Sequence, residues 1–247
     1  MGIIKTIPEV PPENHYHEFF EKIYFNEEDI IWMISLSEVL SNLKQGMSVL
    51  VEYSGATPML AVLRSIIEHY SDKNISIIFS SEVPVKIARN FIEKFETVPE
   101  ILQKVTYYIP GGKLPFENVE YSKGSIKEVI LKAKNEIMFL FGLNYLLAFD
   151  EAETAKQLLT AISKLEESVF FNFIPSYALC SKIGQLIRFS HDVVMRISAQ
   201  LDGYILEITN SWVPGIPPVS INFPGRHVLD EGRRVKTSAL RLSRFLL

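Results

Sequence analysis

The sequence predicts an α/β fold with three layers: a mostly parallel central sheet, helices on both of its faces, and a terminal β-hairpin. Short apolar runs alternate with segments of helical periodicity through most of the 247 residues, which is the pattern of βαβ units. The composition is 47% hydrophobic and 22% charged, as in a globular chain with one sizeable core. Two late apolar runs flank turn-forming residues, which favours the hairpin.

The first predicted elements alternate between helix and strand. Leu36, Val39, Leu40 and Leu43 recur at helical spacing, and this pattern stops before Gly46. A single helix from residue 27 to residue 43 and separate shorter pieces both fit the start of this pattern. Next in order, we expect a strand at residues 47–53, a helix over residues 59–70, a strand at residues 75–79, and a helix with Ala88, Phe91, Ile92 and Phe95 on its inner face.

The second half contains the most apolar predicted strand, at residues 136–143. Continuous apolarity is typical of a strand covered on both faces, so we place this strand in the centre of the sheet. The other expected elements are a strand at residues 104–109 closed by the turn Pro110-Gly111-Gly112, helices at residues 126–133 and 155–165, a strand at residues 169–174, and hairpin strands at residues 203–208 and 219–223.

We expect a single domain over residues 1–247, with an N-terminal extension (1–35), a core (36–223) and a basic C-terminal tail (224–247). The single cysteine, Cys180, has no partner for a disulfide within the chain. The first residues lack the basic and apolar regions of a secretory signal, and no apolar run reaches the roughly 20 residues of a membrane-spanning helix. We therefore expect a cytoplasmic protein without a membrane span.

Charge is distributed unevenly, although the net charge is only −4. Residues 1–29 contain seven acidic side chains and two lysines, whereas residues 225–247 contain six basic and two acidic side chains. This asymmetry favours surfaces that dock on each other within or between subunits, or simply a solvated tail. A nucleic-acid-binding arm is the alternative interpretation of the basic tail.

Three stretches of sequence carry a family resemblance, together with the order of elements. They are residues 36–53 (LSEVLSNLKQGMSVLVEY), residues 77–91 (IIFSSEVPVKIARNF) and residues 199–208 (AQLDGYILEI). In this order they resemble the segment that leads into the P-loop, the second strand with its trailing glutamate, and the entry to a late strand of the single-domain RecA-like ATPases of the KaiC type. Within that class, the chain resembles an uncharacterised archaeal family whose nucleotide-binding signature is eroded.

The resemblance implies a nucleotide site after the first strand, so the groups that phosphoryl transfer needs can be checked one by one. Residues 53–58 (YSGATP) replace G-x-x-x-x-G-K-[ST]; this loop is about three residues shorter and lacks the lysine. Phe141 and Gly142 stand where the family has its magnesium-organising aspartate and a small hydroxyl residue. Glu82 matches the water-activating glutamate, and only Arg226 remains of a basic pair that faces the neighbouring subunit's nucleotide.

A vestigial anion or nucleotide site is therefore one candidate site. Free amides and the helix dipole favour an anion where a strand leads into a helix N-terminus. The candidate residues are Ser54, Gly55, Ala56, Thr57 and Glu82. We expect no catalytic residue and no cofactor. We also expect no metal, because the histidines at 15, 17 and 191 and the lone Cys180 lack partner ligands at metal spacing. We also expect Cys180 to be a small buried residue, Gly111-Gly112-Lys113 to be a turn, and the aromatic residues Phe170, Phe171, Phe173 and Tyr177 to belong to the core.

A candidate partner surface combines an apolar loop with the basic tail. Residues 212–218 (WVPGIPP) would be poorly covered at the tip of a hairpin, and an exposed apolar cluster of this kind often marks a partner surface. Apolar residues near the C-terminus extend this character, although they can instead fold back onto their own domain. The candidate residues are Trp212, Ile216, Arg226, Arg233 and Arg234.

Three functions follow from these observations. The first is a RecA/KaiC-like protein that has lost ATP hydrolysis and acts as a binding or structural partner, in a homo-oligomer or with active relatives. The second is a nucleotide-binding protein or weak ATPase with a non-standard site, which would use ATP, magnesium and Glu82. The third is a nucleic-acid accessory protein that uses the basic tail.

Overall fold

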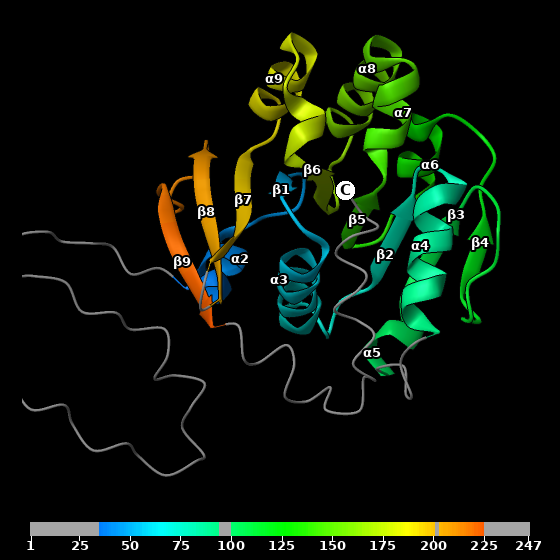
Figure 1. The fold of residues 1–247 in the computed structure, drawn as a ribbon, viewed down its shortest axis with the longest axis horizontal. Helices are drawn as coiled ribbons and strands as arrows, with labels where there is room; N and C mark the ends of the chain where they lie inside the picture. Colours follow the sequence, from blue (N-terminus) through cyan, green and yellow to red (C-terminus); the bar gives the residue numbers. More distant parts are fainter. Residues whose placement is uncertain (1–34, 94–99, 201–202, 225–247) are drawn as a thin grey trace, which may run out of the picture.

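The structure is a computed structural model that describes residues 35–93, 100–200 and 203–224 (Figure 1). Expectations about residues 1–34 and 225–247, which include Arg226, Arg233 and Arg234, lie outside the described residues. Nine strands form one sheet in the order β4-β3-β2-β5-β6-β1-β7-β8-β9. All neighbouring pairs from β4 to β7 are parallel, and β7, β8 and β9 are antiparallel. The predicted α/β class and the terminal hairpin are therefore confirmed.

The strands of this sheet are β1 (Ser48–Tyr53), β2 (Ile75–Phe79), β3 (Thr106–Ile109), β4 (Val119–Tyr121), β5 (Ile137–Phe141), β6 (Val169–Pro175), β7 (Val193–Gln200), β8 (Gly203–Ser211) and β9 (Val219–Pro224). The helices are α2 (Leu36–Asn42), α3 (Ala56–His69), α4 (Glu82–Ile92), α5 (Glu100–Gln103), α6 (Ile126–Ala133), α7 (Leu143–Phe149), α8 (Glu151–Ile162), the 3-10 helix η2 (Ser176–Leu179) and α9 (Lys182–Phe189).

Helices cover the sheet on both faces, which gives the three expected layers (Figure 1). One apolar core joins α2, α3 and α4 to the odd-numbered residues of β1, β2, β5 and β6, such as Val51 and Phe171. A second core joins α6 to α9 to the even-numbered residues of the same strands, such as Leu50 and Phe170. The division follows from strand geometry, because successive side chains point to opposite faces.

Local sequence signals explain where several helices begin. Ser35 and Glu38 form a capping box at the start of α2, and Ser125 and Glu128 form another at the start of α6. Because Ser35 has an extended backbone, α2 begins at Leu36, and residues 27–34 lie outside the described residues. Within the described ranges, no helix has both the length and the apolarity needed to cross a membrane.

The structure differs from the predicted elements at three places. The apolar run at residues 136–143 stops being a strand at Phe141, because Gly142 has a φ of +83° and begins α7. Strand β7 was not predicted as a strand of its own, since Arg196 interrupts its apolar pattern, and it pairs with β1 on one side and β8 on the other. Helix α9 was also not predicted.

Candidate functional site

The carboxyl ends of the parallel strands meet at one edge of the sheet, where open α/β folds bind their ligands. The chain leaves β1 through α3 on one face of the sheet, whereas it leaves β6 through η2 and α9 on the other face. The two connections diverge, so the edge between β1 and β6 is the topological switch point. The predicted site residues that follow β1, β2 and β5 all lie along this edge.

The connection from β1 to α3 consists of Ser54 and Gly55 alone. Gly55 is the N-cap of α3, with an extended φ of −160°, and no side chain caps the helix. The Ser54 amide donates to the Ile197 carbonyl of β7 over 3.3 Å, and the Ser54 hydroxyl lies 3.5 Å from the same oxygen. A phosphate loop of about eight residues has no counterpart in so short a connection.

The first turn of α3 nevertheless has no side chain that caps it. Ala56 and Thr57 follow Gly55 directly, so the backbone of these residues and Ser54 lies together as the sequence requires. An uncapped helix start of this kind presents N–H groups and the positive end of the helix dipole. The arrangement can attract a small anion but offers no lysine to a triphosphate.

An aromatic cluster occupies the end of β5. Phe141 is 9% exposed, and its ring stacks on Phe173 with 4.9 Å between centroids and lies 6.1 Å from the ring of Phe79. A Cβ atom at Gly142 would lie 2.5 Å from Pro84 Cγ, so the chain passes very close to α4 here. Aromatic rings cannot supply the oxygen ligands that magnesium requires.

Glu82 is the first residue of α4 and is exposed, but it lies far from the β1–α3 connection. Strands β6 and β5 lie between β1 and β2, which places the ends of β1 and β2 about 14 Å apart at ordinary strand spacing. The Glu82 carboxylate instead packs on Gly111, where an added Cβ atom would lie 2.3 Å from Glu82 Oε1. The five predicted site residues therefore lie at two separate positions along the edge: residues 54–57 follow β1, and Glu82 follows β2.

Sequence reasoning missed a buried ionic cluster on the opposite face of β1. Glu52 is fully buried and accepts hydrogen bonds from Arg188 of α9, with 3.1 Å from Arg188 Nη2 to Glu52 Oε2. Arg196 Nη2 lies 3.6 Å from the same carboxylate oxygen. Arg188 also donates to the Leu179 carbonyl over 2.9 Å. The hydrogen bond to Glu52 raises the pKa of Arg188, and the bonds from Arg188 to Glu52 and Leu179 hold α9 and η2 on the sheet.

Three tyrosines surround the switch point from β1, α7 and η2. Burial raises the pKa of Tyr53, and the neighbouring Tyr177 and Tyr145 raise it further. Burial also raises the pKa of Tyr145. The phenols of Tyr53 and Tyr145 therefore remain protonated and can act only as neutral hydrogen-bonding groups near pH 7. Tyr177 is 67% exposed and does not belong to the core, which corrects the sequence-based expectation, whereas Phe170, Phe171 and Phe173 are fully buried as expected.

The apolar loop after β8 is only partly exposed. Trp212 is 68% exposed, whereas Ile216 is 3% exposed and packs with Val213 in the core shared with α2 and α3. The expectation that Ile216 belongs to an exposed surface is therefore wrong, because the loop folds its aliphatic residues inward. Other exposed large apolar side chains, which the sequence did not reveal, lie on α7 and α9: Phe149, Leu186 and Phe189.

Cys180 is exposed, so the expectation of a buried cysteine is also wrong. It lies between η2 and α9, where the polar Ser181 N-cap keeps the chain at the surface. In the part of the chain that the structure describes, no three His, Cys, Asp or Glu side chains form a group that could hold a metal ion. His191 is buried, and its Nδ1 lies 2.7 Å from the Ile187 carbonyl.

The architecture and this edge define a RecA/KaiC-like α/β fold, and comparison with solved structures shows the same fold. Protein PH0250 from Pyrococcus horikoshii OT3 matches with a TM-score of 0.57 and 18% identity over 74% of this chain and 95% of that chain. A KaiC-like protein from the same organism, PH0186, matches with a TM-score of 0.52 and 12% identity over 73% and 87% of the two chains.

The flagellar accessory protein FlaH from Methanocaldococcus jannaschii matches with a TM-score of 0.51 and 11% identity, over 74% of this chain and 86% of that chain. No protein-family model and no curated protein sequence matches the chain. The RecA/KaiC-like resemblance stated from the sequence is thus confirmed at the level of the fold.

Proposed function

We propose that this RecA/KaiC-like protein does not hydrolyse ATP and acts as a binding or structural partner, in an assembly of its own copies or with active relatives. The observation that carries the proposal is the two-residue connection Ser54–Gly55 between β1 and α3. Phosphoryl transfer relies on groups that cradle the phosphates and neutralise their charge. A connection of this length supplies neither the loop amides nor the lysine.

The end of β5 supports the same proposal. Phe141 is packed between Phe79 and Phe173, so an aromatic ring stands at the end of this strand, where a carboxylate would organise magnesium. Glu82 can accept a proton, but a general base has to lie within hydrogen-bond reach of the attacking water. Glu82 follows β2, which lies three strand positions from β1, and its carboxylate packs on Gly111 on the far side of β2.

Exposed apolar side chains support the partner role. Trp212 lies beside β8, and Phe149, Leu186 and Phe189 lie on the helices at the opposite side of the sheet. Large exposed aromatic residues are enriched where proteins bind one another.

Calorimetry and a phosphate-release assay with ATP and magnesium test the loss of hydrolysis. We expect no saturable magnesium-dependent binding and no phosphate release above that of a Glu82→Gln variant. Turnover by the natural protein that disappears in Glu82→Gln would contradict the proposal. Light scattering coupled to gel filtration tests the partner role, because a Trp212→Ser variant should shift a concentration-dependent oligomer towards the monomer.

The uncapped start of α3 favours a second candidate function, a protein that binds a nucleotide or another anion without hydrolysing it. Titration with ATP, ADP and sulfate, followed by NMR, separates this function from the first. Saturable shifts of the amides of residues 54–57 and 59 would support it, and their absence would leave the first function alone.

A further inference from the structure

Strands β7, β8 and β9 form one flank of the sheet (Figure 1). One face of this flank belongs to the core with α2 and α3, through side chains such as Met195 and Leu206. The core with α6 to α9 receives Val194 of β7 and no side chain of β8 or β9. The second face of the flank is therefore open among the described residues. The strand register places six side chains on this open face, and none of them is buried: Arg196, Ser198, Ile205, Glu207, Ser220 and Asn222.

A row of charged side chains crosses the open face. Glu52 of β1 is in register with Arg196 of β7. Arg196 is in turn in register with Glu207 of β8, and Ser220 of β9 follows Glu207. Side chains at such neighbouring positions project from the same face of a sheet. The charges along the row are thus negative, positive and negative.

Arg196 is oriented by Glu52 but is not hydrogen-bonded to it. Arg196 Nη2 lies 3.6 Å from Glu52 Oε2, which is longer than a hydrogen bond, and the Arg196 side chain is 45% exposed. Glu52 itself is fully buried and already accepts two hydrogen bonds from Arg188. No hydrogen bond joins the Arg196 guanidinium to another described residue. A buried carboxylate therefore fixes this side chain, while its N–H donors stay open to a further acceptor.

Glu207 is the unpaired acid of the row. It is half-buried between its neighbours on β7 and β9, yet no ion pair or hydrogen bond joins its carboxylate to a described residue. The cation beside it, Arg196, is turned towards Glu52 instead. A half-buried carboxylate loses part of its hydration without gaining a partner. The open face thus carries one incompletely paired cation and one unpaired anion side by side.

Two such charges side by side are complementary to themselves. When two copies meet across a two-fold axis that passes between these side chains, Arg196 of each copy faces Glu207 of the other. Two sheets that pack face to face lie about 10 Å apart. The remaining side chains of the face are uncharged and mostly small, so they allow that approach: Ser198, Ile205, Ser220 and Asn222.

We propose that the open face of β7 to β9 binds the same face of a second copy of the chain, with Arg196 of each copy paired to Glu207 of the other. The proposal rests on the part of the proposed function that assembles the protein from its own copies. The three strands have eight, nine and six residues, which give a face of about 10 by 20 Å. Two such faces bury less than the roughly 1,200 Å² of a standard interface, so the dimer is weak and forms at micromolar or higher concentration.

Sedimentation velocity of the full chain, over about 10 to 500 µM protein, tests this interface. We expect a monomer–dimer equilibrium that weakens as the salt concentration rises, because exposed ion pairs are screened. Glu207→Arg makes both charges of the pair positive, and Arg196→Glu makes both negative. Each variant should weaken self-association at least about tenfold, because attraction becomes repulsion at two contacts of the dimer.

The decisive arm mixes the two variants, because each presents the charges that the other needs. An equimolar mixture of Glu207→Arg and Arg196→Glu should dimerise within about threefold of the natural protein's affinity. If circular dichroism shows that Arg196→Glu does not fold, Arg196→Gln takes its place. Arg196→Gln should then bind Glu207→Arg more tightly than Glu207→Arg binds itself.

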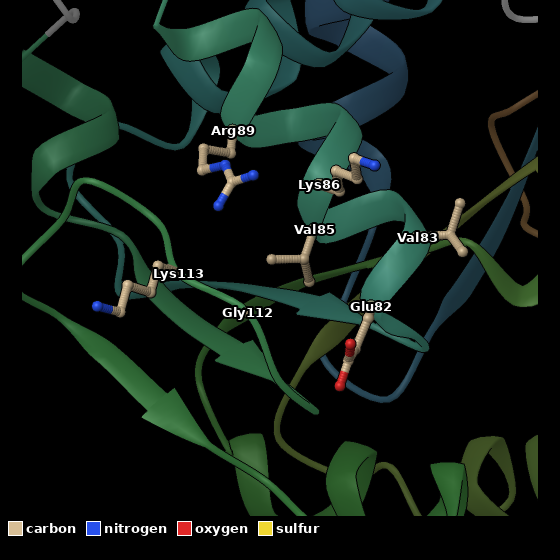
Figure 2. Close-up of a pocket in the computed structure, with 7 residues that line it drawn as sticks. All are labelled: Glu82, Val83, Val85, Lys86, Arg89, Gly112 and Lys113. Carbon is tan, nitrogen blue, oxygen red and sulfur yellow. The ribbon is translucent and has the colours of Figure 1, made fainter.

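Lys113→Glu is the matched control for a reversal of charge. Lys113 is exposed in the loop between β3 and β4, at the other end of the strand order, and Figure 2 shows its amino group pointing away from α4. This variant should change the affinity of self-association by less than about threefold.

Three results would overturn the interface: a natural protein that stays monomeric over this range, charge variants that associate no differently from Lys113→Glu, or a mixture that associates no better than its two components. Association that is lost in Trp212→Ser but kept in both charge variants would overturn the interface and leave the proposed assembly standing. ATP turnover that depends on Glu82 would contradict the proposed loss of hydrolysis alone, because Arg196 and Glu207 lie outside the β1–α3 connection.

Discussion

The two faces of the sheet bury different chemistry, although the same strands form both. The face under α3 and α4 holds an aromatic layer: Phe79, Phe139, Phe141, Phe171 and Phe173. The face under α6 to α9 holds buried polar groups: Ser48, Glu52, Ser76 and Asn172. Several of these bond to the covering segments; Glu52 binds Arg188 of α9, and the Ser76 hydroxyl donates to the Ala133 carbonyl of α6 over 3.3 Å.

The difference teaches how each helical layer is positioned. Hydrogen bonds are directional, so bonds from Glu52 and Ser76 specify where α9 and α6 lie. Apolar packing is not directional, and the aromatic face tolerates changes that conserve volume. The aromatic face also carries α3, and the N-terminus of this helix belongs to the candidate anion site. Four predictions test the contrast.

The largest effect is expected on the polar face. Glu52→Ala removes the carboxylate that Arg188 and Arg196 share and leaves the Arg188 side chain, which is 18% exposed, without its partner. We expect a loss of about 4 kcal/mol in the free energy of unfolding, measured with urea. Arg196→Gln is the control; its side chain is 45% exposed, so the loss should stay below about 1 kcal/mol. A similar small loss for Glu52→Ala would contradict the prediction.

On the aromatic face, Phe141→Ala opens a cavity between Phe79 and Phe173. We expect a loss of about 3 kcal/mol in unfolding free energy, because buried Phe→Ala changes cost about 3 to 5 kcal/mol and this ring lies at the edge of the core. Phe141→Leu should cost about 1 kcal/mol if packing on this face is tolerant. Equal losses in the two variants would show that the ring itself is required.

His191 makes the polar face sensitive to acid. Burial lowers its pKa from 6.5 to about 4, so below pH 6.5 the unfolded chain binds a proton that the folded chain does not. Stability attributable to this group is therefore present above pH 6.5 and is lost as the pH falls towards 4, by about 2 kcal/mol between pH 7 and pH 4.5. Between pH 7 and pH 4.5, the free energy of unfolding should fall less for His191→Gln than for the natural protein, by that amount. An equal fall in the two proteins would rule out the effect.

The smallest expected effect is a gain in stability at Asn172. Its side chain is fully buried in β6, and neither its Nδ2 nor its Oδ1 has a hydrogen-bond partner. Leucine has the same number and branching of side-chain heavy atoms, and it has no polar atoms to satisfy. We therefore expect Asn172→Leu to raise the unfolding free energy by about 1 kcal/mol. A loss of stability in this variant would mean that an ordered water satisfies the amide.

Local patterns were sufficient to predict much of the fold. The alternation of strands β1, β2, β5 and β6 with helices depends on residues within one element, and the hairpin of β8 and β9 has its own turn residues between the strands. Strand β7 was missed because Arg196 interrupts its apolar pattern. That arginine lies near the carboxylate of Glu52 in β1, which is distant in the sequence. The end of β5 was missed because the left-handed backbone of Gly142 is not visible in an apolar run.

The candidate site was less predictable, because its contacts join distant parts of the chain. Ser54, Gly55 and Glu82 could be named from the resemblance, but their separation depends on the insertion of β5 and β6 between β1 and β2. Glu52 and Arg188 are 136 residues apart, so no periodicity reveals the pair. Ile216 was placed on the surface because an apolar loop at the tip of a hairpin was expected to be poorly covered, whereas the fold turns its side chain into the core.

The exposed thiol of Cys180 offers a practical consequence. Since the chain contains one cysteine, a maleimide fluorophore or a nitroxide spin label attaches at a single position without mutagenesis. That position adjoins η2 and α9, close to Tyr177 and the outward-facing side chains of α9. A change in the label's mobility on adding another macromolecule would therefore locate contact on this side of the fold.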